Sequence, residues 1–347
     1  MELISITQNS EIGNQITPFD DSTLTPLQSE HKELSEEGEG KGKYNPFIEA
    51  NTKSISLSTL NNDCIIPVFA KDNEKTIAHQ EFIEATQKSV SKAFPNEQID
   101  LPEIRVSHQI KGRVPSAIHK QVNELLDDEK TQYFERMAFA IRIPSIIETI
   151  NGNPLALIVG GVRAYNHENL YSKRSYEKFS FFIGFQNLVC CNLCISTDGY
   201  KSEVRVGSIE ELQSKILEVL QGYEAEKHLK MMQELSEQNL TEHQFAQLIG
   251  KTRLYNYLPK EQRVQLPQMD FADRQMNTIA KDYYEDKSFC KDENGNINLW
   301  NVYNLFTSAN KSSYIDSFLD RNVNAFEFSN GLATALNGDS NYHWFLS

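Results

Sequence analysis

The stretch Met137-Ala-Phe-Ala-Ile-Arg-Ile143 decides the fold class. Its odd-numbered residues are large and apolar, whereas the residues between them are alanine or arginine. A period of two is typical of a strand with one buried face. Asn151-Gly-Asn-Pro154 then predicts a turn, and Leu155-Ala-Leu-Ile-Val159 predicts a second strand. The two strands therefore begin an antiparallel sheet.

The following residues extend this sheet. Gly160-Gly161 predicts a bulge or a close backbone approach. The nearly continuous apolar run Phe179–Ile195 predicts a central strand, bent at Gly184. Lys201–Val206 follows a turn and predicts the second strand of a hairpin.

Helical patterns flank the sheet. The apolar spacing from Ile77 to Phe94 predicts a helix that stops before Pro95. Ser208-Ile-Glu-Glu211 and Thr241-Glu-His-Gln244 are capping boxes, and Gly250 closes the second helix. Four more helices are predicted over 270–285, 298–307, 311–319 and 323–336. The fold class is α+β, with an antiparallel-rich sheet in the middle segment packed with C-terminal helices.

Composition divides the chain into three parts. Residues 1–45 hold few aromatic side chains and many Ser, Thr, Gln and Glu, which predicts a disordered acidic tail. Residues 46–207 form a β-rich α+β domain, and residues 208–347 form a helical region that packs on it.

Charge, cysteine content and apolar runs indicate the cellular compartment of the protein. The 347 residues carry a net charge of −14 and five cysteines. An odd and small number of cysteines indicates a reducing compartment, and the acidic N-terminus lacks the features of a signal peptide. No run of about 18 apolar residues occurs. We therefore expect a cytoplasmic protein without membrane contact.

The distribution of charge bears on nucleic-acid binding. Residues 101–207 hold 11 acidic and 13 basic side chains, whereas residues 208–347 hold 20 and 13. Phosphate neutralisation drives nucleic-acid binding, so such an acidic chain is a poor general binder. Only the middle segment can present a modestly basic face.

Two short motifs resemble ligand-binding motifs but have a simpler structural explanation. Cys191-Asn-Leu-Cys194 lies in an apolar run without a second ligand pair, which indicates buried thiols and no zinc. Gly250-Lys251-Thr252 resembles the end of a phosphate loop but follows an amphipathic helix. We therefore expect no cofactor.

A weak metal alternative comes from Asp72, Glu74 and His79, two carboxylates and an imidazole within eight residues. Lys71 and Lys75 compete for the carboxylates, and an Asp-x-Glu before a helix is ordinary capping.

Polar and aromatic residues of the middle segment and the C-terminal helices form a hypothetical groove for single-stranded nucleic acid. Cations would follow the backbone, and aromatic faces would stack on bases. The set is Lys111, Arg113, Arg163, Tyr165, Arg205, Trp300, Lys311, Tyr314 and Arg321. The alternative places these aromatic rings in the core and pairs the cations with carboxylates.

The motifs Pro102–His108, Gly160–Tyr165, Phe182–Cys190 and Leu299–Thr307 resemble an uncharacterised bacterial family of domains of unknown function. Cys64–Glu74 and Lys311–Arg321 share this resemblance, which covers residues 55–347. The family is associated with conjugative and phage-like elements and is distantly similar to phage/plasmid-like proteins of unknown function. The resemblance implies a mobile element as the genomic setting and brings no catalytic residues with it.

The leading functional hypothesis is a non-enzymatic accessory protein of mobile-element DNA maintenance, transfer or recombination. It would bind single-stranded DNA or a DNA-processing protein. One alternative is a metal-dependent nuclease or hydrolase. Another is a protein-interaction or counter-defence factor that makes no nucleic-acid contact.

Overall fold

The computed structural model describes residues 45–66, 76–165, 176–338 and 340–347. The chain divides into the units Met1–Asn45 and Pro46–Ser347, and the predicted disordered tail lies outside the described residues except for Asn45. Pro46–Ser347 has the predicted α+β fold, with an antiparallel sheet packed with helices. Within the described ranges, no helix combines the length and the apolar character needed to cross a bilayer.

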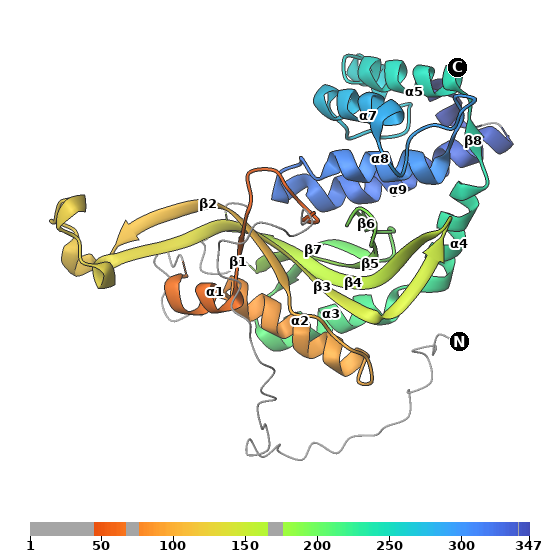
Figure 1. Ribbon diagram of the computed structural model, residues 1–347. Coiled ribbons are helices and arrows are strands. Elements are labelled where there is room, and N and C mark those ends of the chain that lie inside the picture. The colour runs from red at the N-terminus through yellow and green to blue at the C-terminus, as the bar shows by residue number, and fades with distance from the viewer. Residues whose placement is uncertain (1–44, 67–75, 166–175, 339) are drawn as a thin grey trace. The chain divides into compact units, whose positions relative to one another are not determined.

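Seven antiparallel strands form the main sheet in the order β1-β2-β3-β4-β5-β6, with β7 also paired to β5 (Figure 1). They are β1 (Lys53–Ile55), β2 (Glu103–Arg113), β3 (Lys130–Ile150), β4 (Asn153–Ala164), β5 (Glu177–Asn187), β6 (Leu193–Cys194) and β7 (Tyr200–Val206). A separate two-stranded sheet joins β8 (Asn239–Leu240) to β9 (Ile297–Asn298).

The predicted turn joins β3 to β4. Asn151 and Gly152 both have left-handed backbones, with φ of 48° and 76°. Tight hairpins need this conformation at both central residues, and Asn-Gly adopts it readily. The strands predicted at 137–143 and 155–159 lie within β3 and β4 and pair directly.

Nine α-helices occur in the described residues. They are α1 (Leu57–Asp63), α2 (His79–Ala93), α3 (Ile209–Gly222), α4 (Ala225–Ser236), α5 (Glu242–Tyr255), α6 (Lys260–Arg263), α7 (Asp273–Glu285), α8 (Leu299–Asn310) and α9 (Ile315–Asn337). Short 3₁₀ segments are η2 (Pro115–Ala117), η3 (Val122–Glu124), η4 (Asp127–Glu129) and η6 (Asn341–Phe345).

Helices cover both faces of the sheet, so the alternation in β3 separates large from small side chains rather than buried from exposed ones. Phe139 and its odd-numbered neighbours join the core beneath α2 and α3, whereas Ala138 and Ala140 face α9 (Figure 1). The small alanine side chains leave room for Phe318 and Leu319 of α9. The sheet is therefore a buried middle layer.

The double glycine makes a close approach rather than a bulge. Its pairing with β3 and β5 is continuous. A Cβ atom on Gly161 would lie 2.5 Å from Cζ of Phe82, and one on Gly160 would lie 2.1 Å from the carbonyl oxygen of Phe139.

The predicted strand over 179–195 is too long. β5 ends at Asn187, whose side-chain oxygen accepts a hydrogen bond from the Val189 N–H at 2.9 Å. Cys191 takes a left-handed backbone with φ of 58°, and β6 follows. The side-chain amide of Asn187 thus forms a turn that apolar content does not reveal.

Two helix boundaries also differ. α5 continues through Gly250 to Tyr255, because burial of Thr252 and Tyr255 offsets the helix penalty of one glycine, about 1 kcal/mol. The helices predicted at 311–319 and 323–336 are the single helix α9. Its polar Arg321 does not break the helix, because Nε donates to the Asp270 carbonyl at 2.9 Å.

Candidate functional site

Arg163 on β4 is the centre of a buried charged cluster. The residue is 1% exposed and forms an ion pair with Glu177, the first residue of β5. Its guanidinium carbon lies 4.6 Å from the ring centre of Tyr165 and 4.5 Å from that of Phe179. Glu177 also accepts the Ile77 N–H at 3.0 Å. The cluster fixes the start of α2 against two strands.

His79, the first residue of α2, completes this cluster. Its ring stacks on Tyr165 with centres 4.2 Å apart. Nε2 lies 2.8 Å from the carbonyl oxygen of Phe134. A carbonyl only accepts, so Nε2 carries the proton and Nδ1 holds the lone pair. Burial, and then Arg163, lowers the pKa of His79 to about 3, so the ring is neutral near pH 7.

Of the three residues of the weak metal alternative, the structure describes only His79. Asp72 and Glu74 lie outside the described residues. His79 has one nitrogen engaged by a carbonyl and a buried Nδ1 without a hydrogen-bond partner among the described residues. Within those residues, no three His, Cys, Asp or Glu side chains gather as a metal site. The Asp72–Glu74–His79 site stays a prediction.

Trp300 and Lys311 of the predicted groove are also internal. Trp300 is fully buried, and Nε1 donates to Oδ1 of Asn153 at 2.7 Å. Lys311 donates from Nζ to the Cys190 carbonyl, and its own carbonyl accepts the Glu49 N–H at 2.9 Å. Burial lowers the pKa of Lys311. Trp300 therefore attaches α8 to the start of β4, and Lys311 attaches the end of α8 to the loop between β5 and β6.

The remaining members of the predicted groove reach the surface to different degrees. Lys111 and Tyr314 are exposed, and Arg205 is exposed and pairs with Glu203 at 3.0 Å. Arg113 donates to the Lys120 carbonyl, and Arg321 is held by backbone and hydroxyl oxygens. Four of the nine residues, Arg163, Tyr165, Trp300 and Lys311, have almost no exposed surface. A nucleic acid does not reach these four in this conformation.

The most exposed feature of the sheet is a hairpin formed by β2 and β3. β1 begins opposite Val106, and β4 ends opposite Arg136. Beyond these points, β2 and β3 continue as a paired ribbon. We call residues 107–135 the arm and residues 114–129 its tip. Figure 1 shows the arm projecting from the sheet, with η2, η3 and η4 in its tip.

The tip exposes apolar side chains. Ile118, Val122 and Leu126 are 64%, 73% and 61% exposed. Lys120 pairs with Glu129, and Lys130 pairs with Asp127. Glu124 and Asp128 have no basic partner among the described residues. The tip therefore combines three exposed aliphatic side chains with two carboxylates that lack a basic partner among the described residues, of which Glu124 accepts the Gln121 N–H at 3.0 Å.

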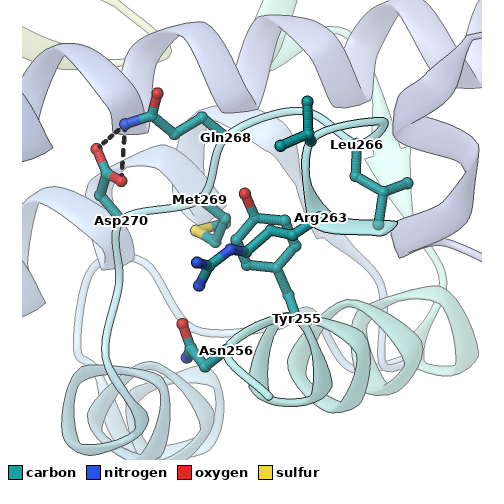
Figure 2. Close-up of a pocket in the computed structure, with 8 residues that line it drawn as sticks. Tyr255, Asn256, Arg263, Leu266, Gln268, Met269 and Asp270 are labelled. Atoms are coloured by element: carbon teal, nitrogen blue, oxygen red, sulfur yellow. Dashed lines mark hydrogen bonds between the residues drawn. The ribbon is translucent and has the colours of Figure 1, made fainter. Parts of the chain in front are cut away.

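A hollow of about 400 Å³ lies among the C-terminal helices and is lined by Tyr255, Asn256, Arg263, Val264, Leu266, Gln268, Met269 and Asp270. It is bounded by the end of α5, by α6 and by the segment leading to α7. Figure 2 shows the Arg263 side chain reaching into it beside Tyr255 and Met269. Val264 on its edge is 76% exposed. Lys260 and Arg263 have no acidic partner in the described part of the chain.

Residues 28–346 match the protein family described as "Domain of unknown function, B. Theta Gene description (DUF3871)". The chain belongs to the DUF3871 family. The match covers the buried cluster, the arm and the hollow of this DUF3871 chain. No curated protein and no solved structure matches it.

Sequence reasoning did not find the tip residues. Ile118, Val122 and Leu126 recur every four residues, a spacing that suggests a helix face. Val122 instead lies in η3, Ile118 follows η2 and Leu126 precedes η4, and all three remain exposed in this DUF3871 protein. Three aliphatic residues at this spacing, in a stretch rich in polar residues, are the signal that the sequence offers.

Proposed function

We propose that this DUF3871 protein is a non-enzymatic binding protein whose arm holds a protein partner. The exposed apolar tip is the observation that supports this function. Isolated apolar residues are common on surfaces, but three exposed aliphatic side chains within one projecting hairpin tip favour an interaction role. The complementary surface on the partner would be apolar with basic residues around it, because Glu124 and Asp128 are unpaired.

The proposed setting is the maintenance, transfer or recombination of mobile-element DNA in the cytoplasm. The resemblance to a family found on conjugative and phage-like elements supports this setting. A partner that processes DNA would suit a binding protein of this kind.

Contact with single-stranded DNA is a second candidate function, favoured by Lys111 on the arm and by the exposed ring of Tyr314. A gel shift of single-stranded DNA at about 50 mM salt tests it, because phosphate contacts are strongest at low salt. Lys111→Ala should weaken binding and flatten its salt dependence. No shift with the unchanged protein would contradict this candidate.

The arm function is tested in cells that carry the gene on a transferable element. Deletion of the gene should lower transfer, and Val122→Asp should lower it to the same level. Leu101→Asp is the matched control, because Leu101 is equally exposed but lies outside the arm and the hollow. Equal transfer by the deletion strain and the parent would contradict the proposal.

A further inference from the structure

We propose that the hollow binds a small zwitterion, namely an α-amino acid with an aliphatic side chain. Arg263 would hold the carboxylate of this ligand, and Asp270 would hold its ammonium group. The arm takes no part in this site, because α5 and α7 lie well away from the arm in Figure 1.

The wall of the hollow that carries Asp270 is fixed by side chains of α9. Residues 268–271 form neither a helix nor a strand. Asn324 accepts the Asp270 N–H at 3.0 Å and donates to the Gln268 carbonyl at 3.0 Å. Arg321 donates from Nε to the Asp270 carbonyl at 2.9 Å. A polar wall that is ordered in advance loses little conformational entropy when a ligand binds.

The charges of the hollow are balanced. Arg263 and Asp270 both line it, and neither forms an ion pair among the described residues. Its exposed lining is more polar than apolar. A simple anion would be repelled by Asp270 and by the net charge of −14, and a simple cation would be repelled by Arg263. A zwitterion offers a partner to each charge.

The hydrogen-bonding groups of the hollow suit the two ends of an α-amino acid. A guanidinium group binds a carboxylate through two parallel hydrogen bonds. An ammonium group has three donors and needs acceptors. Asp270 supplies them, and Gln268 orients its carboxylate by donating from Nε2 at 2.9 and 2.8 Å (Figure 2). The side-chain oxygen of Asn256 accepts no hydrogen bond within the described residues, so it is a further acceptor.

The size and the apolar part of the hollow limit the ligand further. Its volume of about 400 Å³ is near the lower end of the range of about 300–1,000 Å³ usual for ligand pockets. Val264 is 76% exposed and Leu266 is half-buried, so both can contact an aliphatic side chain. Among the described lining residues, the one aromatic ring is that of Tyr255, which is 6% exposed. A nucleobase would therefore find no ring face on which to stack.

Ligand-observed NMR of the full chain detects weak complexes and tests the site. The ligands are L-alanine, L-valine, L-leucine, L-isoleucine and L-methionine, at least one of which should bind. The amide of the tightest binder lacks the carboxylate, and its N-acetyl derivative lacks the ammonium group. Each derivative should bind more weakly by about tenfold or more, because it loses one charge-assisted contact.

Two variants assign each charge to its residue. Arg263→Gln should weaken binding of the amino acid by about tenfold or more but leave binding of the amide unchanged, because the amide has no carboxylate to lose. Asp270→Asn should leave binding of the N-acetyl derivative unchanged in the same way. Arg274→Gln is the matched control, because Arg274 is exposed on α7 and does not line the hollow. Circular dichroism shows that each variant is folded.

Four results would overturn the inference: no binding by any of the five amino acids, equal binding of either derivative, an Arg263→Gln chain that binds as the wild type does, or equal weakening by Arg274→Gln. The transfer assay with Val122→Asp is independent of this site. Failure of the amino acid to bind therefore leaves the proposed function of the arm intact, and unchanged transfer leaves the site in the hollow intact.

Discussion

Arg163 is held by a largely buried ion pair with Glu177, and removal of its side chain tests this role. Arg163→Ala leaves the Glu177 carboxylate in a largely buried site without its cation. Removing one partner of a buried pair lowers the free energy of unfolding by about 3–5 kcal/mol. Urea denaturation should show a loss of this size.

Arg205→Ala is the matched control, because Arg205 and Glu203 form a pair in which both side chains are about half exposed. Exposed pairs contribute about 0–1 kcal/mol. Equal losses for the two variants would contradict the structural role of Arg163.

Because His79 is buried and neutral, the free energy of unfolding should fall as pH falls. Its pKa of about 3 in the folded chain lies below the ordinary 6.5. The stabilisation is therefore fully present above pH 6.5 and is lost as pH falls towards 3. The loss approaches about 1.4 kcal/mol per pH unit for one histidine. Between pH 6 and pH 5, His79→Gln should reduce the slope of unfolding free energy against pH by about this amount. An unchanged slope would count against a neutral, buried ring.

At the scale of residues, the sequence singles out Arg163 and Tyr165 but not their surroundings. Both attract notice as polar residues after a double glycine. Their partners Glu177 and His79 come from separate parts of the chain, and only the antiparallel register of β4 and β5 brings Glu177 close. A single sequence does not contain that register.

Two glycines test how closely the elements pack. A Cβ atom on Gly161 would lie 2.5 Å from Phe82 on α2 and 2.7 Å from the Ser180 carbonyl on β5. Overpacking of this kind lowers stability by about 1–3 kcal/mol. Gly161→Ala should therefore lower the melting temperature.

Gly250→Ala provides the opposite case within α5. A Cβ atom there meets nothing within 4 Å, and alanine favours a helix over glycine by about 1 kcal/mol. This variant should be as stable as the wild type or more so. A loss for Gly250→Ala equal to that for Gly161→Ala would contradict the described packing.

At the scale of elements, strands that are buried could be predicted from their apolar residues, and strands that are exposed could not. The alternation over 137–143 and the run at 155–159 identify β3 and β4. The outer half of β2 has exposed side chains on both faces, so it shows no period of two. The arm was missed for this reason, because its length comes from pairing rather than from burial.

At the scale of the whole molecule, the tip of the arm is expected to serve binding and not folding. Val122 is exposed, so Val122→Asp should change the free energy of unfolding by no more than about 0.5 kcal/mol. Thermal denaturation of dilute protein measures this. A larger loss would mean that the tip packs on the rest of the molecule.

The most direct test of the account is to identify what the tip touches. A photoreactive amino acid replaces Val122 in cells that carry the gene on a transferable element, and light is then applied. Cross-links from the tip to a partner protein are expected, whereas the same replacement at the equally exposed Leu101 should give none to that protein. Cross-links confined to the chain itself, or the same products from both positions, would contradict the proposed function of the arm.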